Sequence, residues 1–371
     1  MKVTFPHMGN TYIPVKALLD ELGIEYVIPP FNNKKALELG TKYAPEMACL
    51  PLKINLGNFI QAHELGADLI LISGGCGPCR FGYYGEMHRE ILKDLGFNME
   101  VFTLDISKKD ISGFLRNIKR ITGEFKPYKI LKAIKKTAEV SKQVDELERL
   151  SFKIRPREIV KGSADRIYKS FQNSVLNKKG AKEIKELIDF TRKNLLDIET
   201  DKSLDPIKIG IVGEIYTTND PFTNFRIESR LGNEGAEVMR PVTVSGWIID
   251  HMIKKALGLK GDESYKEAAK PYLGAMIGGH TQETIGNTVL LAKDGYDGII
   301  QILPLGCMPE IVSESILPSI ERDLNIPVLT LIIDEMTGEA GYLTRIEAFV
   351  DLLKRRKEEG LIAGKRMLSW N

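Results

Sequence analysis

The feature that most limits the fold is an alternation of short apolar segments with amphipathic ones, which occurs twice along the 371 residues. In residues 1–105 the apolar segments are KVTFPHM, EYVIPP, ADLILISGG and MEVFTLD, with helical patterns between them. In residues 206–371 they are IKIGIVGE, AEVMRPV, YDGIIQILPLG and IPVLTLIIDE. Strands that alternate with helices predict a parallel sheet covered by helices. We therefore expect two α/β domains, which share one general plan without a clean internal repeat.

Residues 106–205 differ from both flanks because no segment in them has a convincing strand pattern. Four stretches carry apolar residues at helical spacing: FLRNIKRITGEF, KILKAIKKTAEVSKQVDELERL, SADRIYKSFQN and AKEIKELIDFTRKNLLDI. We interpret them as a helical section that joins the domains 1–105 and 206–371. This section has 25 Lys and Arg against 15 Asp and Glu, a surplus of ten, whereas the whole chain carries +2. Such a surplus is usually a solvated helical face, and the alternative is a docking surface for an acidic or phosphorylated partner.

The composition excludes several classes of protein. Hydrophobic residues make up 43% and charged residues 27% of the chain, which is typical of a soluble globular protein. No apolar run approaches the roughly 18–20 residues that cross a bilayer, and MKVTFPHMGN does not resemble a signal peptide. We expect a cytoplasmic protein that binds no membrane. We also expect no nucleic-acid partner, because no basic-aromatic motif accompanies the charge surplus.

The four cysteines share a sequence context that composition does not explain. Cys49, Cys76 and Cys307 each have a proline two residues later, and Cys79 closes the motif Cys-Gly-Pro-Cys. Proline suits the first turn of a helix, so each such cysteine would precede a helix N-terminus, where thiolate is favoured. Cys76 and Cys307 also follow strand segments, and open α/β sheets place their ligands at the carboxyl ends of strands.

Several interpretations compete for these thiols. An isolated cysteine is most often a buried, inert side chain, but the shared context argues against that here. A dithiol–disulfide pair would use Cys76 and Cys79 and leave Cys49 and Cys307 without a role. Structural zinc usually takes two close pairs, and a c-type haem needs histidine where Arg80 stands. We favour an iron–sulfur cluster, which tolerates distant thiolate ligands and would lie in the cleft between the two α/β domains.

Other motifs point less clearly to a function. The chain has no GxxxxGK[ST] loop and no clean GxGxxG fingerprint. The segment GGHTQETIG, residues 278–286, predicts a turn that enters a helix rather than a nucleotide loop. His280, Glu310 and Tyr84 lie near the cysteine segments in sequence and are candidates for a substrate pocket, with a structural role as the alternative for each.

Two basic residues closely follow cysteines in the sequence. Lys53 comes four residues after Cys49, and Arg80 comes directly after Cys79. Both are either ordinary surface charges or, next to a cluster, cations that stabilise its negative charge and raise its potential.

At the cysteine segments the chain resembles a known family. The resemblance is carried by FPHMGNTYIPVKALLDELG, LELGTKYAPEMACLPLKINLGNFIQA, GGCGPCRFGYYGEMHREILKDLG, LGCMPEIVSESILPSIERD and IPVLTLIIDEMTGEAGYLTRIEAFVDLL. These segments resemble the acyl-CoA dehydratase activase-related proteins, also called CoA protein activases. That family belongs to the superfamily of the 2-hydroxyacyl-CoA dehydratases and the double-cubane cluster proteins. The resemblance covers nearly the whole chain and is weakest in the helical section.

The resemblance implies two flavodoxin-like or Rossmann-like domains with an iron–sulfur cluster in the cleft between them. Its ligands would be Cys49, Cys76, Cys79 and Cys307. A double-cubane cluster needs more cysteines than the four present, so we expect a single [4Fe–4S] cubane. The dehydratases use three cysteines per cluster, which leaves open whether Cys76 ligates permanently, leaves on reduction or stays free.

The resemblance also implies a function. Members of the superfamily receive single electrons at low potential from a separate ATP-hydrolysing activator. The chain has none of that activator's ATP-binding motifs, so we expect it to accept these electrons and to perform or relay reductive chemistry on a small molecule or acyl-CoA substrate. The alternatives are a non-redox metal-binding accessory or assembly protein of a dehydratase system, and a thiol–disulfide oxidoreductase that uses Cys76 and Cys79. Relatives pair, so we expect a homodimer.

Overall fold

The computed structural model describes residues 1–74, 79–104, 119–123, 126–248, 261 and 263–368. Three expected features therefore lie wholly or partly outside the described residues. They are Cys76, most of the helix expected in 114–125, and the larger part of the helix expected in 247–258.

The first parallel sheet has the order β1-β2-β3. Its strands are β1 (Val3–Thr4), β2 (Leu69–Ser73) and β3 (Glu100–Leu104). The helices around it are η1 (Gly9–Thr11), α1 (Tyr12–Leu22), α2 (Lys34–Tyr43), α3 (Leu50–Glu64), η2 (Arg80–Tyr83) and α4 (Tyr84–Asp94). The segment EYVIPP, expected as a strand, forms only an isolated parallel bridge between Tyr26 and Val3. The segment ends in Pro29 and Pro30, and a proline has no N–H to continue a ladder.

The second parallel sheet has the order β5-β4-β6-β7. Its strands are β4 (Ile207–Gly213), β5 (Ala236–Met239), β6 (Gly298–Pro304) and β7 (Val328–Ile333). The helices of this part are α9 (Ile215–Asn219), α10 (Ile227–Asn233), α11 (Val244–Ile248), α12 (Ser264–Ala269), α13 (Thr281–Lys293), α14 (Met308–Leu324) and α15 (Glu339–Leu368). Strand β6 is buried along its whole length, as expected for a central strand covered on both faces. The predicted α/β class with two parallel sheets is confirmed.

The two sheets follow the same plan. In the second sheet, β5 lies on one side of β4 and β6 on the other. In the first, the bridge at Tyr26 lies on one side of β1 and β2 on the other. Each sheet therefore has a switch point beside its first strand, and such sheets bind ligands outside the carboxyl ends of the strands there. Strands β2 and β6, which precede the cysteines, occupy corresponding places.

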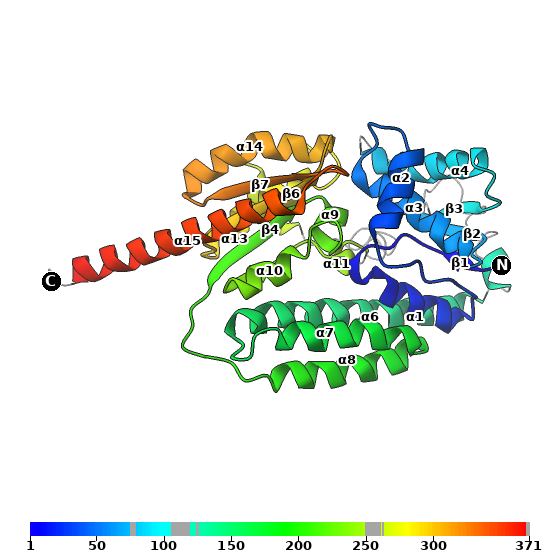
Figure 1. Cartoon of the computed structure of the whole chain (residues 1–371), viewed down its shortest axis with the longest axis horizontal. Helices are drawn as coiled ribbons and strands as arrows, with labels where there is room; N and C mark the ends of the chain where they lie inside the picture. The colour runs from blue at the N-terminus through cyan, green and yellow to red at the C-terminus, as the bar shows by residue number, and fades with distance from the viewer. Residues whose placement is uncertain (75–78, 105–118, 124–125, 249–260, 262, 369–371) are drawn as a thin grey trace.

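The described part of the middle section is helical, as predicted. It comprises α6 (Pro127–Ile154), η3 (Arg155–Arg157), α7 (Ser163–Ser174), η4 (Val175–Asn177) and α8 (Gly180–Leu196). In Figure 1 these helices lie along one side of the molecule, beneath both sheets. They share one apolar core with α1, in which Val140, Leu147 and Ile184 pack with Tyr12 and Ile13. The section therefore packs on the first domain rather than merely connecting two domains, and the expected boundaries at 105 and 205 stay a prediction.

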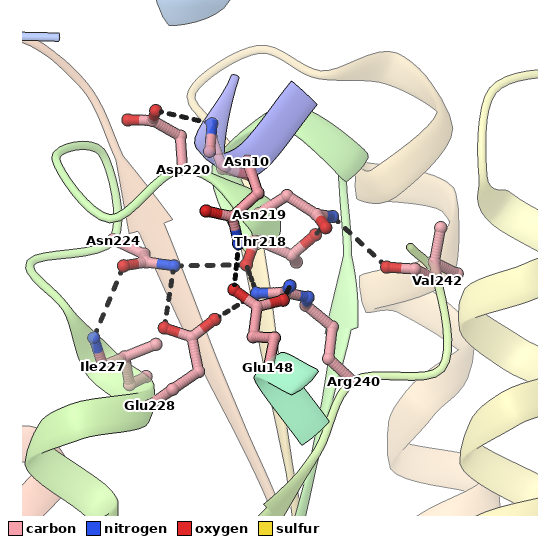
Figure 2. Close-up of polar contacts among 12 residues, drawn as sticks. Asn10, Glu148, Thr218, Asn219, Asp220, Asn224, Ile227, Glu228, Arg240 and Val242 are labelled. Carbon is pink, nitrogen blue, oxygen red and sulfur yellow. Dashed lines mark hydrogen bonds and ion pairs between the residues drawn. The ribbon is translucent and has the colours of Figure 1, made fainter. Parts of the chain in front are cut away.

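A buried ion network ties α6 to the second domain (Figure 2). Arg240, after β5, is 4% exposed and pairs with both Glu148 of α6 and Glu228 of α10. Arg240 Nη1 also donates to the carbonyl of Thr218 at 3.1 Å. Asn10, near the start of the chain, donates to Glu148 Oε1 at 2.8 Å. Through Glu148, which Arg240 and Asn10 both contact, this network joins all three parts of the molecule.

None of the described helices combines the length and the apolar character that a membrane span requires.

Candidate metal centre

Three of the four cysteines lie at the starts of helices, and for Cys49 and Cys307 the following prolines predict this. Cys49 is the N-cap of α3, Cys79 of η2 and Cys307 of α14, each with extended backbone. Pro51 and Pro309 occupy the first turns of α3 and α14, where a missing N–H costs nothing. The predicted helix starts are therefore confirmed at Cys49 and Cys307. At Cys79 the short helix η2 runs directly into α4.

Helix α3 holds Cys49 between the two sheets. Its sequence LPLKINLGNFIQAHE is apolar on nearly every side, and residues 50–62 are all buried, which is typical of a helix with neighbours all round. Leu52 and Phe59 pack in the core around β2. Leu50 and Ile54 pack instead in the core of the second sheet, with Ile209. A helix of the first domain thus begins, at Cys49, inside the contact between the domains.

One guanidinium connects the three cysteine segments. Arg80 directly follows Cys79, and its Nη1 donates to the carbonyl of Met47 at 2.6 Å, two residues before Cys49. Its Nη2 donates to the carbonyl of Gly306 at 2.7 Å, directly before Cys307. Segments separated by more than 200 residues are therefore brought together at one side chain.

The three described thiols are recessed and reduced. Cys49 and Cys307 are each 9% exposed, Cys79 is half-buried, and none of the three forms a disulfide. Burial raises the pKa of each thiol, most strongly at Cys307. Negative charge on Cys49 further raises the pKa of Cys79, and charge on Cys79 raises that of Cys307. The helix starts predict a favoured thiolate at these cysteines, but burial outweighs that effect and favours the protonated thiol.

A tyrosine hydroxyl contacts one of these sulfurs. Tyr84, the first residue of α4, is buried and places its hydroxyl 2.7 Å from Cys49 Sγ. Burial and the neighbouring Cys49 raise the pKa of Tyr84 well above its ordinary value. The hydroxyl therefore keeps its proton and can donate it in a hydrogen bond to a Cys49 thiolate.

The sequence pattern did not indicate Glu214, a carboxylate whose charge raises the pKa of all three described thiols. Glu214 directly follows β4, and its side chain caps α9 by accepting from Tyr216 N at 3.0 Å and Thr217 N at 2.9 Å. Its charge raises the pKa of Cys49, Cys79 and Cys307, in each case as a smaller effect than burial. Its position after β4, the strand beside β6, is the signal that could have indicated it.

The remaining candidates for a substrate pocket, Glu310 and His280, have different surroundings. Glu310 is 1% exposed and accepts from Thr284 Oγ1 at 3.1 and 3.0 Å and from Gln301 Nε2 at 3.0 Å. Burial raises the pKa of Glu310 to about 7. Its carboxylate is thus held by its own domain, which favours the structural role for this residue.

His280 is the N-cap of α13, in the loop that packs on the start of α14. A Cβ placed on Gly279 would lie 2.6 Å from Pro309 Cγ, so only glycine permits this contact between the His280 loop and the segment after Cys307. His280 therefore lies beside one cysteine segment, and a catalytic role for it stays a prediction.

Lys53 and Arg80 have different surroundings. Lys53 is 2% exposed, donates to the carbonyl of Glu46 at 2.9 Å and pairs with Glu335, which follows β7. It is therefore a buried tie between the domains and not a surface charge. Arg80 is exposed, and within the described residues no carboxylate pairs with it.

The chain matches the family model described as 2-hydroxyglutaryl-CoA dehydratase, D-component, over residues 12–353. The chain belongs to this family. The match supports the expected dehydratase superfamily and does not single out the activase-related proteins. No curated protein matches the chain. Members of the D-component family are iron–sulfur components of 2-hydroxyacyl-CoA dehydratases and work with a separate ATP-dependent activator.

The described thiols are donors of the chemical kind that holds an iron–sulfur cluster. Within the described residues, no three His, Cys, Asp or Glu side chains are arranged to hold one metal ion. Three recessed thiols lie on segments that meet at Arg80, and thiolates are the usual ligands of iron–sulfur clusters.

Proposed function

We propose that this protein is the [4Fe–4S] component of a 2-hydroxyacyl-CoA dehydratase-type system. It accepts low-potential electrons from a separate ATP-hydrolysing activator and performs or relays reductive chemistry on an acyl-CoA or other small substrate. The observation that carries this proposal is the meeting of the Cys49, Cys79 and Cys307 segments at the Arg80 guanidinium. We further propose that the protein is cytoplasmic and acts as a homodimer.

Cys49, Cys79 and Cys307 would hold the cluster, with Cys76 as the fourth expected ligand. When bound, the cluster supplies one-electron transfer at low potential. Burial of Cys49 and Cys307 keeps water away and disfavours added negative charge, which lowers the potential. Negative charge on Glu214 acts in the same direction, because it raises the pKa of all three thiols.

Two groups of the chain oppose these effects. Tyr84 would donate its hydroxyl proton in a hydrogen bond to the sulfur of Cys49. Arg80 brings a positive charge that lowers the pKa of Cys49 and Cys79, against the larger effect of burial. Together these residues would set the reduction potential of the cluster, and this potential determines how strong its electron donor must be.

Metal analysis tests the proposal directly. After anaerobic purification, about four iron and four sulfide per chain are expected for a cubane. Zinc without sulfide would instead support the non-redox accessory role. A metal-free protein whose thiols cycle with thioredoxin would support the thiol–disulfide alternative, and either result would contradict the cluster.

Replacing Tyr84 by phenylalanine should lower the reduction potential of the cluster. The substitution removes the only hydroxyl near Cys49 among the described contacts and keeps the ring, which packs on Phe81 and His88. If the hydrogen bond favours the reduced state by ~1 kcal/mol, the one-electron potential falls by roughly 40 mV. Redox titration followed by electron paramagnetic resonance measures the shift.

The matched control is Tyr83→Phe, because Tyr83 is 70% exposed and precedes the same helix. Its potential should stay within error of the parent protein. Equal potentials in Tyr84→Phe and the parent would show that the hydroxyl does not bond to a ligand sulfur.

A further inference from the structure

We propose that Arg80 is a positioning residue that fixes the spacing of Cys307 from the cysteines of the first domain. Its guanidinium bonds two carbonyls that lie in different domains, Met47 O at 2.6 Å and Gly306 O at 2.7 Å. Arg80 is itself bonded through the chain to Cys79, so one side chain sets the relative place of three cysteine segments. The contacts of Arg80 require no cluster. Only the purpose of the spacing, which is to hold a cluster, rests on the proposed function.

The planar fork of arginine matters here more than its charge. Two hydrogen bonds from different nitrogens of one rigid group fix both the distance and the direction between their acceptors. A lysine at this position would keep the charge but act as a single point, and could not fix two carbonyls in the same way. Arg80 therefore differs in role from a cation that merely tunes the potential.

The Gly306 backbone is shaped to receive this guanidinium. Gly306 has φ +70°, a conformation that side chains rarely adopt, and a Cβ placed there would lie 3.4 Å from Arg80 Nη2. Glycine thus allows the turn before Cys307 because of its positive φ, and the guanidinium lies at ordinary van der Waals distance from the place of a Cβ.

Other contacts keep the domains together when Arg80 is changed. Lys53 pairs with Glu335 across the domains. In a second region, Tyr216 donates its hydroxyl to the carbonyl of His7 at 2.7 Å. Gly9 N donates to Asp220 Oδ2 at 3.1 Å. We therefore expect Arg80 variants to fold and to differ only in the spacing of the cysteine segments.

The experiment uses reduced, metal-free protein in a Cys76→Ser background, which leaves Cys49, Cys79 and Cys307 as the thiols. A short bifunctional thiol reagent is added, and the yield of cross-links that include Cys307 is measured by peptide mass spectrometry. With Arg80→Lys this yield should fall roughly tenfold, because about one charge-assisted hydrogen bond between the domains is lost. Arg80→Gln should behave similarly, because the amide cannot bridge both carbonyls.

The control is Arg89→Lys, because Arg89 also bonds a carbonyl, that of Val101 at 2.9 Å, but entirely within the first domain. Its cross-link yield should equal that of the Cys76→Ser parent, and thermal unfolding confirms that every variant is folded. A parent-like yield in Arg80→Lys would overturn the positioning role whether or not a cluster exists. A reduced yield in a protein found to bind no iron would keep the positioning role and overturn the proposed function alone.

Discussion

Replacing Cys307 by alanine is expected to remove most of the iron and sulfide from anaerobically purified protein. This cysteine belongs to the second domain, whereas Cys49, Cys76 and Cys79 belong to the first. Without Cys307 the proposed cluster would keep no ligand from the second domain, and its iron beside α14 would lose a recessed thiolate that is only 9% exposed. Iron and sulfide per chain, measured beside circular dichroism, give the result.

The appropriate control is Met308→Ala, because Met308 follows Cys307 directly and its side chain is 38% exposed. Its cluster content should equal that of the parent protein. Cys76→Ala is expected to reduce the cluster content less than Cys49→Ala, since related dehydratases manage with three cysteines. Full cluster content in Cys307→Ala would contradict a site shared by the two domains, and equal, complete loss in Cys76→Ala and Cys49→Ala would contradict the special role of Cys76.

Replacing Arg240 by methionine should lower the free energy of unfolding by about 3–5 kcal/mol. The substitution leaves Glu148 and Glu228 without their shared cation. Burial and the charge of Glu228 already act against ionisation of Glu148, whose pKa is raised to about 6. Denaturant unfolding measures the loss at neutral pH, where the Glu148 carboxyl is ionised in the unfolded chain but is buried without its cation in the folded variant.

A matched control is Arg192→Met, because Arg192 of α8 pairs with Glu146 of α6 at 3.3 Å on a half-exposed surface. That pair should contribute no more than about 1 kcal/mol. Adding Glu148→Gln and Glu228→Gln to Arg240→Met should recover part of the stability, because no buried charge then lacks a partner. If Arg240→Met and Arg192→Met cost the same, the buried network does not hold the three parts together.

The sequence was sufficient for the elements that depend on local pattern. The apolar segments of β2, β4 and β6 are long enough to be recognised, and Pro51 and Pro309 correctly indicate helices that begin at cysteines. The strand expected at EYVIPP is wrong, because only a single bridge between Tyr26 and Val3 forms before the two prolines that end the segment. Such features follow from neighbours in the chain.

The contacts that shape the candidate site depend instead on how distant segments meet. The position of Glu214 after a strand segment could mark it as a candidate, but its effect on the pKa of three thiols depends on the adjacency of β4 and β6. In the same way, the sequence shows Leu50 and Ile54 as part of an apolar helix but does not show that they pack in the core of the second sheet. The interdomain role of Arg80 is invisible in sequence because its acceptors are backbone carbonyls, which every residue has.

The matching places of β2 and β6 have a consequence for how the molecule can move. Each half of the protein has a cysteine segment that follows the equivalent strand, so the proposed ligand cage would be divided along the seam between two similar halves. A pivot about that seam would widen or narrow the cage while every strand keeps its partners. If the proposed cluster is bound there, the orientation of the two halves and the capacity to retain the cluster would be coupled.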